Sequence, residues 1–311
     1  MSRLAIVMGS VAAWTAVTSL AQQAPFRAGA DLVEVYATVK LKDGTIAHDL
    51  TREDFELGDD GKPREIAVFS RSIQPLSVAL VLDHSGSTGP DFDTVRLAAQ
   101  DFVTRLLRTD RAAIRTLTWA CQAFTEDRMA LIRVLRGHLP PDQGSPIWAA
   151  TDAAVSSLMA ESGRRIIVLM SDGIDVQGTG YVGASAPMES PCQPAAVAEG
   201  SSVGDVMKRV ESEGVMVYTV GVEATVIAGH SGLRDLVTIA ERSGAEYRHL
   251  NSYDQLRAAF TRIADELHLQ YLLGFVPAAF DGRRHEIEVK TKRSGVTVRA
   301  RKTYVATKEG G

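Results

Sequence analysis

The sequence predicts an α/β fold in which a doubly wound, mainly parallel sheet is inserted into a small β-sandwich. Between residues 75 and 269, short apolar segments alternate with amphipathic segments of helical period, as in a parallel sheet covered by helices. At 31–72 and 270–305, apolar and polar residues alternate one by one, which is typical of half-buried strands. Each β-rich end is too short to bury a core alone, so we expect the two ends to pack together.

The composition is that of a globular protein. The chain has 311 residues, of which 45% are hydrophobic and 23% charged, too apolar for a disordered chain. The formal net charge is −4, so the charge gives no indication of nucleic-acid binding.

Residues 1–21 have the pattern of a secretory signal peptide. Arg3 supplies a positive charge, an apolar run follows from Leu4 to Val17, and Ser19-Leu20-Ala21 is a small-x-small cleavage site. Cleavage after Ala21 predicts export to the periplasm or the medium; an uncleaved membrane anchor is the alternative. No later stretch is long and apolar enough to span a membrane.

Export makes the two cysteines relevant, because disulfides form in oxidising compartments. Cys121 and Cys192 are the only cysteines of the chain. A disulfide between them and two separate thiols are both compatible with the spacing, since sequence separation does not fix their geometry.

The N-terminal part, 31–72, predicts short strands joined by turns. Residues 31–40 alternate between apolar and polar side chains, and 55–57 and 65–70 are two further strand candidates around an Asp-Asp-Gly turn. No helix pattern follows any of them, so we expect hairpins.

The central part, 75–269, predicts alternating strands and helices. The expected strands are 76–82, 113–119, 165–170, 215–220 and 246–250, with 121–125 as a short antiparallel edge strand. The expected helices are 91–108, 128–137, 147–161, 202–213, 233–243 and 253–269.

The C-terminal part, 270–305, returns to the period of a strand. Residues 270–276 form one expected strand, and 286–292 and 296–301 are expected to pair as a hairpin across Ser294-Gly295.

A cluster of oxygen ligands follows the first strand of the central part. The apolar run 76–82 ends abruptly at Asp83-His84-Ser85-Gly86-Ser87, which places Asp83, Ser85 and Ser87 at the carboxyl end of a central parallel strand. A carboxylate and two hydroxyls are ligands that Mg²⁺ prefers. Asp and Ser are also common in ordinary turns and helix caps, so this motif alone does not distinguish a metal site from such a turn.

Two later loops add to this cluster. Ser145 precedes Pro146 at the expected start of a helix; its hydroxyl can either cap that helix or reach a metal ion. Asp172 follows the buried strand 165–170 and is therefore a second acid at the same edge of the sheet.

These three loops resemble those of the von Willebrand factor type A domain. D-x-S-x-S after the first strand, a hydroxyl residue before a later helix, and S-D-G after the next strand are similar to its metal-ion-dependent adhesion site. The flanks resemble a narrower group, the exported acidobacterial-type proteins related to von Willebrand A domains. The motifs concerned are L-T-R-E-D-F-E-L-G-D-D-G-K-P-R-E-I at 50–66, G-R-R-I-I-V-L-M-S-D-G at 163–173 and Q-Y-L-L-G-F-V-P at 270–277.

The resemblance, which covers about 31–304, implies one Mg²⁺ or Mn²⁺ held by five residues: Asp83, Ser85, Ser87, Ser145 and Asp172. The family usually has Thr where this chain has Ser145. The narrower group tends to have an acid where this chain has Ala149.

The resemblance further implies a non-enzymatic module that binds an Asp or Glu of a partner protein through the ion. A scaffold that kept the fold but lost useful metal affinity is the alternative, motivated by Ser145 and Ala149. A metal-assisted hydrolase ranks last, because the three loops offer no general base with a clear role.

Overall fold

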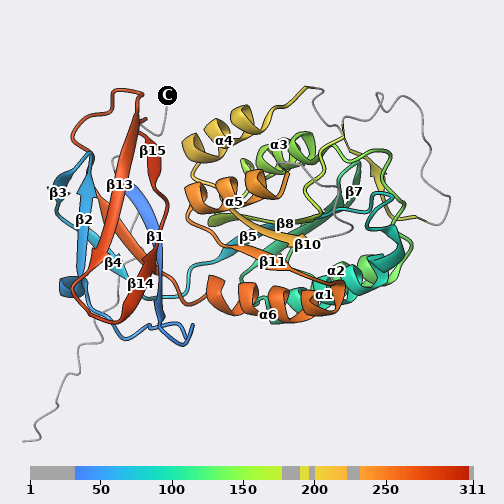
Figure 1. Cartoon of the computed structure of the whole chain (residues 1–311), viewed down its shortest axis with the longest axis horizontal. Coiled ribbons are helices and arrows are strands. Elements are labelled where there is room, and N and C mark those ends of the chain that lie inside the picture. The colour runs from blue at the N-terminus through green and yellow to red at the C-terminus, as the bar shows by residue number, and fades with distance from the viewer. Residues whose placement is uncertain (1–31, 177–189, 196–199, 223–231, 308–311) are drawn as a thin grey trace, which may run out of the picture.

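The computed structural model describes residues 32–176, 190–195, 200–222 and 232–307, and it has two parts (Figure 1). A central sheet covered by helices forms one part, and two small antiparallel sheets form the other. The chain passes from the small sheets into the central part at Leu76 and returns after Leu267. The predicted fold class is confirmed. The predicted signal peptide, 1–21, lies outside the described residues.

The central sheet has the strand order β11-β10-β8-β5-β6-β7-β9. All pairs from β11 to β6 are parallel, whereas β7 and β9 are antiparallel. All seven residues of β5 are buried, as expected of a strand covered on both faces. The strands are β5 (Leu76–Leu82), β6 (Arg111–Thr116), β7 (Trp119–Thr125), β8 (Arg164–Ser171), β9 (Gln193–Pro194), β10 (Met216–Val222) and β11 (Tyr247–Leu250).

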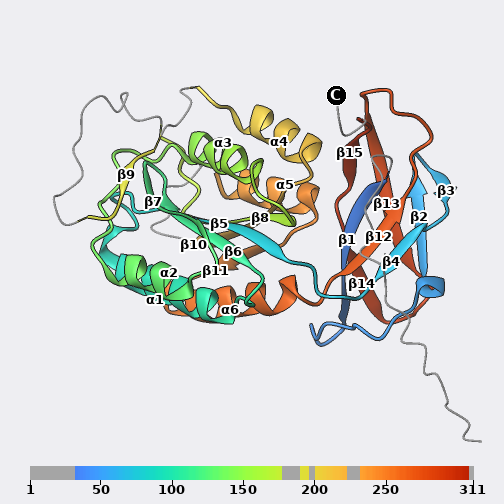
Figure 2. The ribbon, with the colours of Figure 1, turned by 180° about the vertical axis from the view of Figure 1, so that it is seen from behind.

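Three helices cover each face of this sheet (Figures 1 and 2). One core lies under α1, α2 and α6, and a second core lies under α3, α4 and α5. None of these helices is long and apolar enough to cross a membrane. The helices are α1 (Phe92–Arg105), α2 (Arg128–Arg136), α3 (Ile147–Leu158), α4 (Val203–Ser212), α5 (Gly232–Ser243) and α6 (Leu256–Leu267), with short 3-10 turns at Arg52–Asp54, Gly89–Asp91 and Tyr253–Gln255.

The two ends of the chain share one β-sandwich. One sheet has the order β14-β1-β12-β4 and the other β15-β13-β2-β3, so each sheet combines strands from both ends. Their inner faces enclose a single core that includes Val35, Phe55, Leu273 and Tyr304. The strands are β1 (Val33–Leu41), β2 (Phe55–Asp59), β3 (Lys62–Arg64), β4 (Val68–Ser70), β12 (Tyr271–Phe275), β13 (Arg284–Thr291), β14 (Val296–Arg299) and β15 (Thr303–Val305).

The expected hairpin of 286–292 and 296–301 is wrong. Its two strands belong to different sheets: β13 pairs with β2, whereas β14 pairs with β1. The cause is the length of β1, whose first half pairs with β12 and whose second half, Thr38–Leu41, remains free to pair with β14. The expected strand 65–70 is shorter than predicted, since only Val68–Ser70 forms a strand, β4, and the preceding strand β3 lies in the other sheet.

The expected strand 113–119 ends early. Leu117 and Thr118 lie between β6 and β7 because their N–H groups donate to the carboxylate of Asp142, at 3.1 and 2.8 Å, instead of to a neighbouring strand. The edge strand expected at 121–125 is the longer β7, and β9 pairs beyond it, so β7 is not at the edge.

A disulfide joins Cys121 in β7 to Cys192 beside β9. Both sulfur-bearing residues are buried, and the bond closes a loop of 71 residues that contains Ser145 and Asp172.

Removing this disulfide is expected to destabilise the protein. Closing a loop of this length reduces the conformational entropy of the unfolded chain. The double substitution Cys121→Ser/Cys192→Ser should therefore lower the free energy of unfolding by about 3–4 kcal/mol. Urea denaturation of oxidised wild type and of the variant measures this difference. Two alkylatable thiols in the unreduced wild type would contradict the bond.

Candidate metal centre

The three predicted loops meet at one edge of the central sheet. The loop after β5 carries Asp83, Ser85 and Ser87, the segment before α3 carries Ser145, and the turn after β8 carries Asp172. Because β5 and β8 are parallel neighbours, their carboxyl ends lie side by side. The structure brings all five side chains together through the contacts described below.

Asp83 is at the centre of this group and is fully buried. Its Oδ1 accepts from the Ser85 N–H at 2.9 Å, and its Oδ2 accepts from the hydroxyls of Ser171 at 2.6 Å and Ser145 at 3.3 Å. The Thr88 hydroxyl donates to the carbonyls of Asp83 at 2.8 Å and Ser85 at 3.2 Å, which fixes the turn of the loop.

Asp172 connects to the first loop through two serines. The Ser87 hydroxyl donates to Asp172 Oδ2 at 2.6 Å, and the hydroxyl oxygens of Ser85 and Ser87 are 3.2 Å apart. Asp172 Oδ1 accepts from the Ile174 N–H at 3.0 Å, so its carboxylate is oriented by its own turn. Ser87 is exposed, whereas Asp172 and Ser85 are buried.

Ser145 does not cap the helix that it precedes. Its side chain donates to Asp83, and its backbone pairs with Val176 in both directions at 3.0 Å. Asp175 accepts from the Trp148 N–H at 3.4 Å at the start of α3 instead. Ala149 is buried in the first turn of α3, so no acid supports the loop from that position.

The two carboxylates have no basic partner within the part of the chain that the structure describes. No Lys, Arg or His of the described residues forms an ion pair with Asp83 or Asp172. Burial raises the pKa of Asp83 to about 6 despite the hydrogen bonds from Ser171 and Ser85, and the negative charge of Asp172 adds to the increase. A cavity of about 200 Å³ opens beside them, lined by Ser85, Ser87 and Ser145 among others.

Sequence reasoning missed two residues that shape this edge. Ser171 donates to Asp83, and its position at the end of a buried strand in S-D-G is the signal that could have identified it. Asp142 accepts from the His84 N–H at 2.9 Å as well as from the loop after β6, so it ties two loops together. Nothing in the local pattern around Asp142 indicates this role.

A second cluster of possible metal ligands lies in the sandwich, at Asp59, Asp60 and His285. Its atoms have protein partners: Asp59 accepts from Arg64 at 3.0 Å and from the Tyr304 hydroxyl at 3.1 Å, and the His285 nitrogens face Asp60 at 2.8 Å and Asp281 at 3.0 Å. Hydrogen bonding to Asp281 raises the pKa of His285. We interpret this cluster as an ion-pair network.

The comparison with protein families identifies the central part. The family model of the von Willebrand factor type A domain matches residues 77–262, more than half of the chain. This chain belongs to the von Willebrand factor type A family. The match extends from the second residue of β5 into α6, so it includes the three loops of the candidate metal centre in the type A domain. No curated protein matches the chain.

Several solved structures are similar to this type A protein. An aerotolerance-related membrane protein from Bacteroides fragilis is 18% identical, with 62% of this chain and 98% of that chain covered and a TM-score of 0.46. The vWF domain of the type V pili tip protein Mfa5 from Porphyromonas gingivalis is 16% identical, covers 62% and 95%, and has a TM-score of 0.44. A von Willebrand factor type A protein from Catenulispora acidiphila is 12% identical, covers 91% and 76%, and has a TM-score of 0.45. At such scores none of them indicates what this chain binds.

Proposed function

We propose that this protein is an exported, non-enzymatic module that binds a partner protein through a divalent cation. The ion would be Mg²⁺ or Mn²⁺, held by Asp83, Ser85, Ser87, Ser145 and Asp172. The observation that carries the proposal is the convergence of two buried carboxylates, which have no basic partner among the described residues, on serine hydroxyls beside an open cavity.

The donor set fits a hard cation. Two carboxylates whose charges repel each other gain from a shared positive charge, and hydroxyl and carboxylate oxygens suit Mg²⁺ and Mn²⁺. The exposed Ser87 and the exposed Gly86 leave one side of the group open to solvent. When bound, the ion would offer a partner's Asp or Glu an electrophilic position on that side.

A metal-independent scaffold is the second candidate. Each of the two carboxylates already accepts a hydroxyl hydrogen bond at 2.6 Å, and Ala149 brings no third acid to the site. Hydrogen bonds of this kind stabilise the loops without an ion, and a cation must compete with them.

Calorimetric titration with Mn²⁺ separates the two candidates. We expect one ion per chain for the wild type and a loss of at least about 100-fold in affinity for Asp172→Ala, since outer partners of a metal site alone are worth 10–100-fold. Ser85→Ala removes a neutral ligand and should cost less, about tenfold. Ser145→Thr should bind more tightly, because the branched side chain restricts the hydroxyl.

Asp93→Ala is the matched control, since Asp93 is exposed and, among the described residues, pairs only with Arg96 of the same helix. Its Mn²⁺ affinity should equal that of the wild type. Equal affinities for wild type and Asp172→Ala, or no binding by the wild type, would favour the scaffold. If Mn²⁺ binds, capture of the partner should in turn require Mg²⁺ and be lost with a chelator.

A further inference from the structure

A crevice of about 260 Å³ lies between the sandwich and the central part. Its walls come from the start of β1, the starts of β8 and β10, the end of α4 and the end of β15. It is at the amino edge of the parallel sheet, whereas the candidate metal centre is at the carboxyl edge. The strand β8 joins the two, with Arg164 at its start and Asp172 just after its end.

Arg164 is the most buried cation of this crevice, with only 6% of its surface exposed. Its Nη1 donates to the carbonyl of Leu267 at 2.9 Å, its Nη2 contacts the sulfur of Met216 at 3.1 Å, and its guanidinium lies 4.2 Å from the ring centre of Tyr36. Its Nε is buried and has no hydrogen-bond partner in the described parts of the chain. These contacts orient the guanidinium but do not neutralise it.

Arg301 lines the same crevice from the sandwich side, and its guanidinium has fewer polar contacts than that of Arg164. Its guanidinium forms no hydrogen bond or ion pair with any described residue, and its Nε is buried without a partner. Burial lowers the pKa of Arg301 to about 10. Arg165 is also in the wall; its Nη1 donates to the carbonyl of Glu213 at a long 3.5 Å, and its Nε has no partner among the described residues.

The acids of the crevice do not pair with these arginines. Glu211 forms ion pairs with Arg242 at 2.5 Å and with Arg284 at 3.0 Å. Glu34 is exposed and accepts from the Tyr36 hydroxyl at 3.0 Å, and Glu213 is exposed at the rim. The crevice is therefore lined by three arginines, none of which has a carboxylate within ion-pair distance among the described residues.

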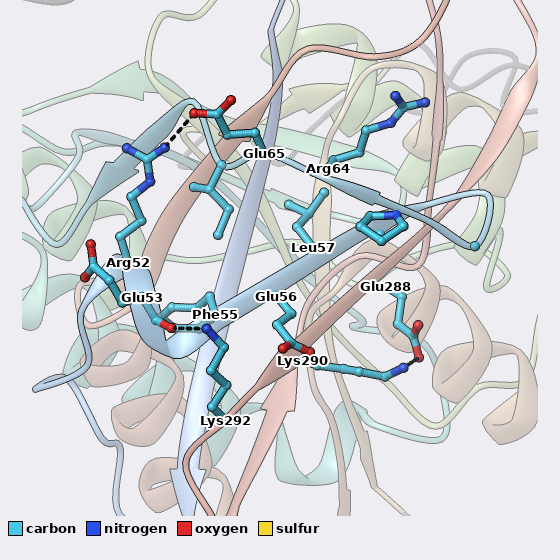
Figure 3. Close-up of a pocket in the computed structure, with 14 residues that line it drawn as sticks. Arg52, Glu53, Phe55, Glu56, Leu57, Arg64, Glu65, Glu288, Lys290 and Lys292 are labelled. Carbon is cyan, nitrogen blue, oxygen red and sulfur yellow. Dashed lines mark hydrogen bonds and ion pairs between the residues drawn. The ribbon is translucent and has the colours of Figure 1, made fainter.

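A hollow of about 570 Å³ on the outer sheet of the sandwich has a different arrangement of charges (Figure 3). There the charged side chains are engaged locally: Arg52 pairs with Glu65 at 3.3 Å, Lys290 with Glu288 at 2.7 Å, and Lys292 donates to a backbone carbonyl at 2.8 Å. Because these cations already have partners, an anion would gain little by binding there, and we assign no ligand to this hollow.

We propose that the crevice at Arg164, Arg165 and Arg301 binds a small molecule with a carboxylate or phosphate group. A buried charge without a counter-charge is costly, and an oxyanion removes that cost. The planar guanidinium matches the two oxygens of such a group. The volume limits the ligand to about ten non-hydrogen atoms, and Val33, Met216 and Phe280 in the wall favour a short apolar part.

Calorimetry with butyrate and with inorganic phosphate, each against chloride at equal ionic strength, tests this site. A chelator in every buffer keeps the metal centre out of the measurement. We expect one butyrate or one phosphate per chain, and the better of the two identifies the oxyanion. Arg301→Met should reduce that affinity at least about tenfold, the equivalent of a single hydrogen bond to a charged group, and Arg301→Lys should be intermediate.

The control is Arg293→Met, which removes an exposed arginine of the same sandwich that pairs with Asp49. It should bind the anion as the wild type does. In chloride alone, Arg301→Met should resist urea at least as well as the wild type, because it removes a partly buried charge that has no ion-pair partner among the described residues. Failure of the wild type to bind either anion, equal affinity of Arg301→Met, or a clear loss of its stability in chloride would each overturn the proposal.

Discussion

Replacing Glu266 with Gln is expected to lower the free energy of unfolding by about 3 kcal/mol, the usual cost of removing one partner from a buried ion pair. Glu266 is at the end of α6, and only 1% of its surface is exposed. Its carboxylate pairs with Arg299 of β14 and, at 2.9 Å, with Lys40 of β1. Loss of this charge leaves both cations of the sandwich with less compensation at the boundary between the two parts.

The effect should be large because the surrounding polar groups depend on the same carboxylate. The Tyr218 hydroxyl donates to Glu266 Oε1 at 2.8 Å, and the Thr38 hydroxyl donates to it at 3.4 Å. Glu246 pairs with the same Lys40 and Arg299; although burial opposes it, these two cations lower the pKa of Glu246 to about 2. The network therefore joins strands of the sandwich to β10 and α6 of the central part.

Glu241→Gln is the matched control. Glu241 pairs with Lys302 across the same boundary, but at 3.5 Å and with both side chains more than half exposed. Such pairs contribute little, so this variant should stay within about 0.5 kcal/mol of the wild type. Urea denaturation followed by tryptophan fluorescence compares the three proteins. If Glu266→Gln unfolds like Glu241→Gln, the buried network does not stabilise the junction.

The fold could be predicted from the sequence because its determinants are local. A strand such as 76–82 is apolar at nearly every position only when both of its faces are covered, and α6 repeats its apolar residues every three or four positions. The local sequence of a strand does not determine which other strand it pairs with. The turn at Ser294-Gly295 suits a hairpin, yet the free half of β1 pairs with β14.

In the candidate metal centre, too, some residues could be predicted from the sequence and others could not. Asp83 and Asp172 were identifiable because each follows a buried strand and is therefore placed at the carboxyl edge by the strand itself. Asp142 was not, because its hydrogen bonds go to residues more than twenty positions away. Arg301, whose guanidinium has no partner among the described residues, is likewise recognisable only in the folded structure, since its sequence surroundings are those of an ordinary basic strand.

Replacing Gly232 with Ala is expected to weaken metal binding at the candidate metal centre without changing any of its proposed ligands. A Cβ at Gly232, the first residue of α5, would lie 1.5 Å from the carbonyl oxygen of Gly173. Gly173 follows Asp172 and has a φ of +81°, a backbone conformation that residues other than glycine rarely adopt. Neither backbone can move without shifting the turn that orients the Asp172 carboxylate.

We therefore expect Gly232→Ala to lower the free energy of unfolding by about 3 kcal/mol, at the upper end of the usual cost of overpacking, and to lower Mn²⁺ affinity as well. Gly204→Ala in α4 is the control, because its Cβ would meet only the Ser202 hydroxyl at 3.7 Å. Alanine there should be neutral or stabilise the helix by up to about 1 kcal/mol. Wild-type Mn²⁺ affinity in a folded Gly232→Ala protein would mean that the contact does not position Asp172; if Asp172→Ala also binds normally, the ion is elsewhere.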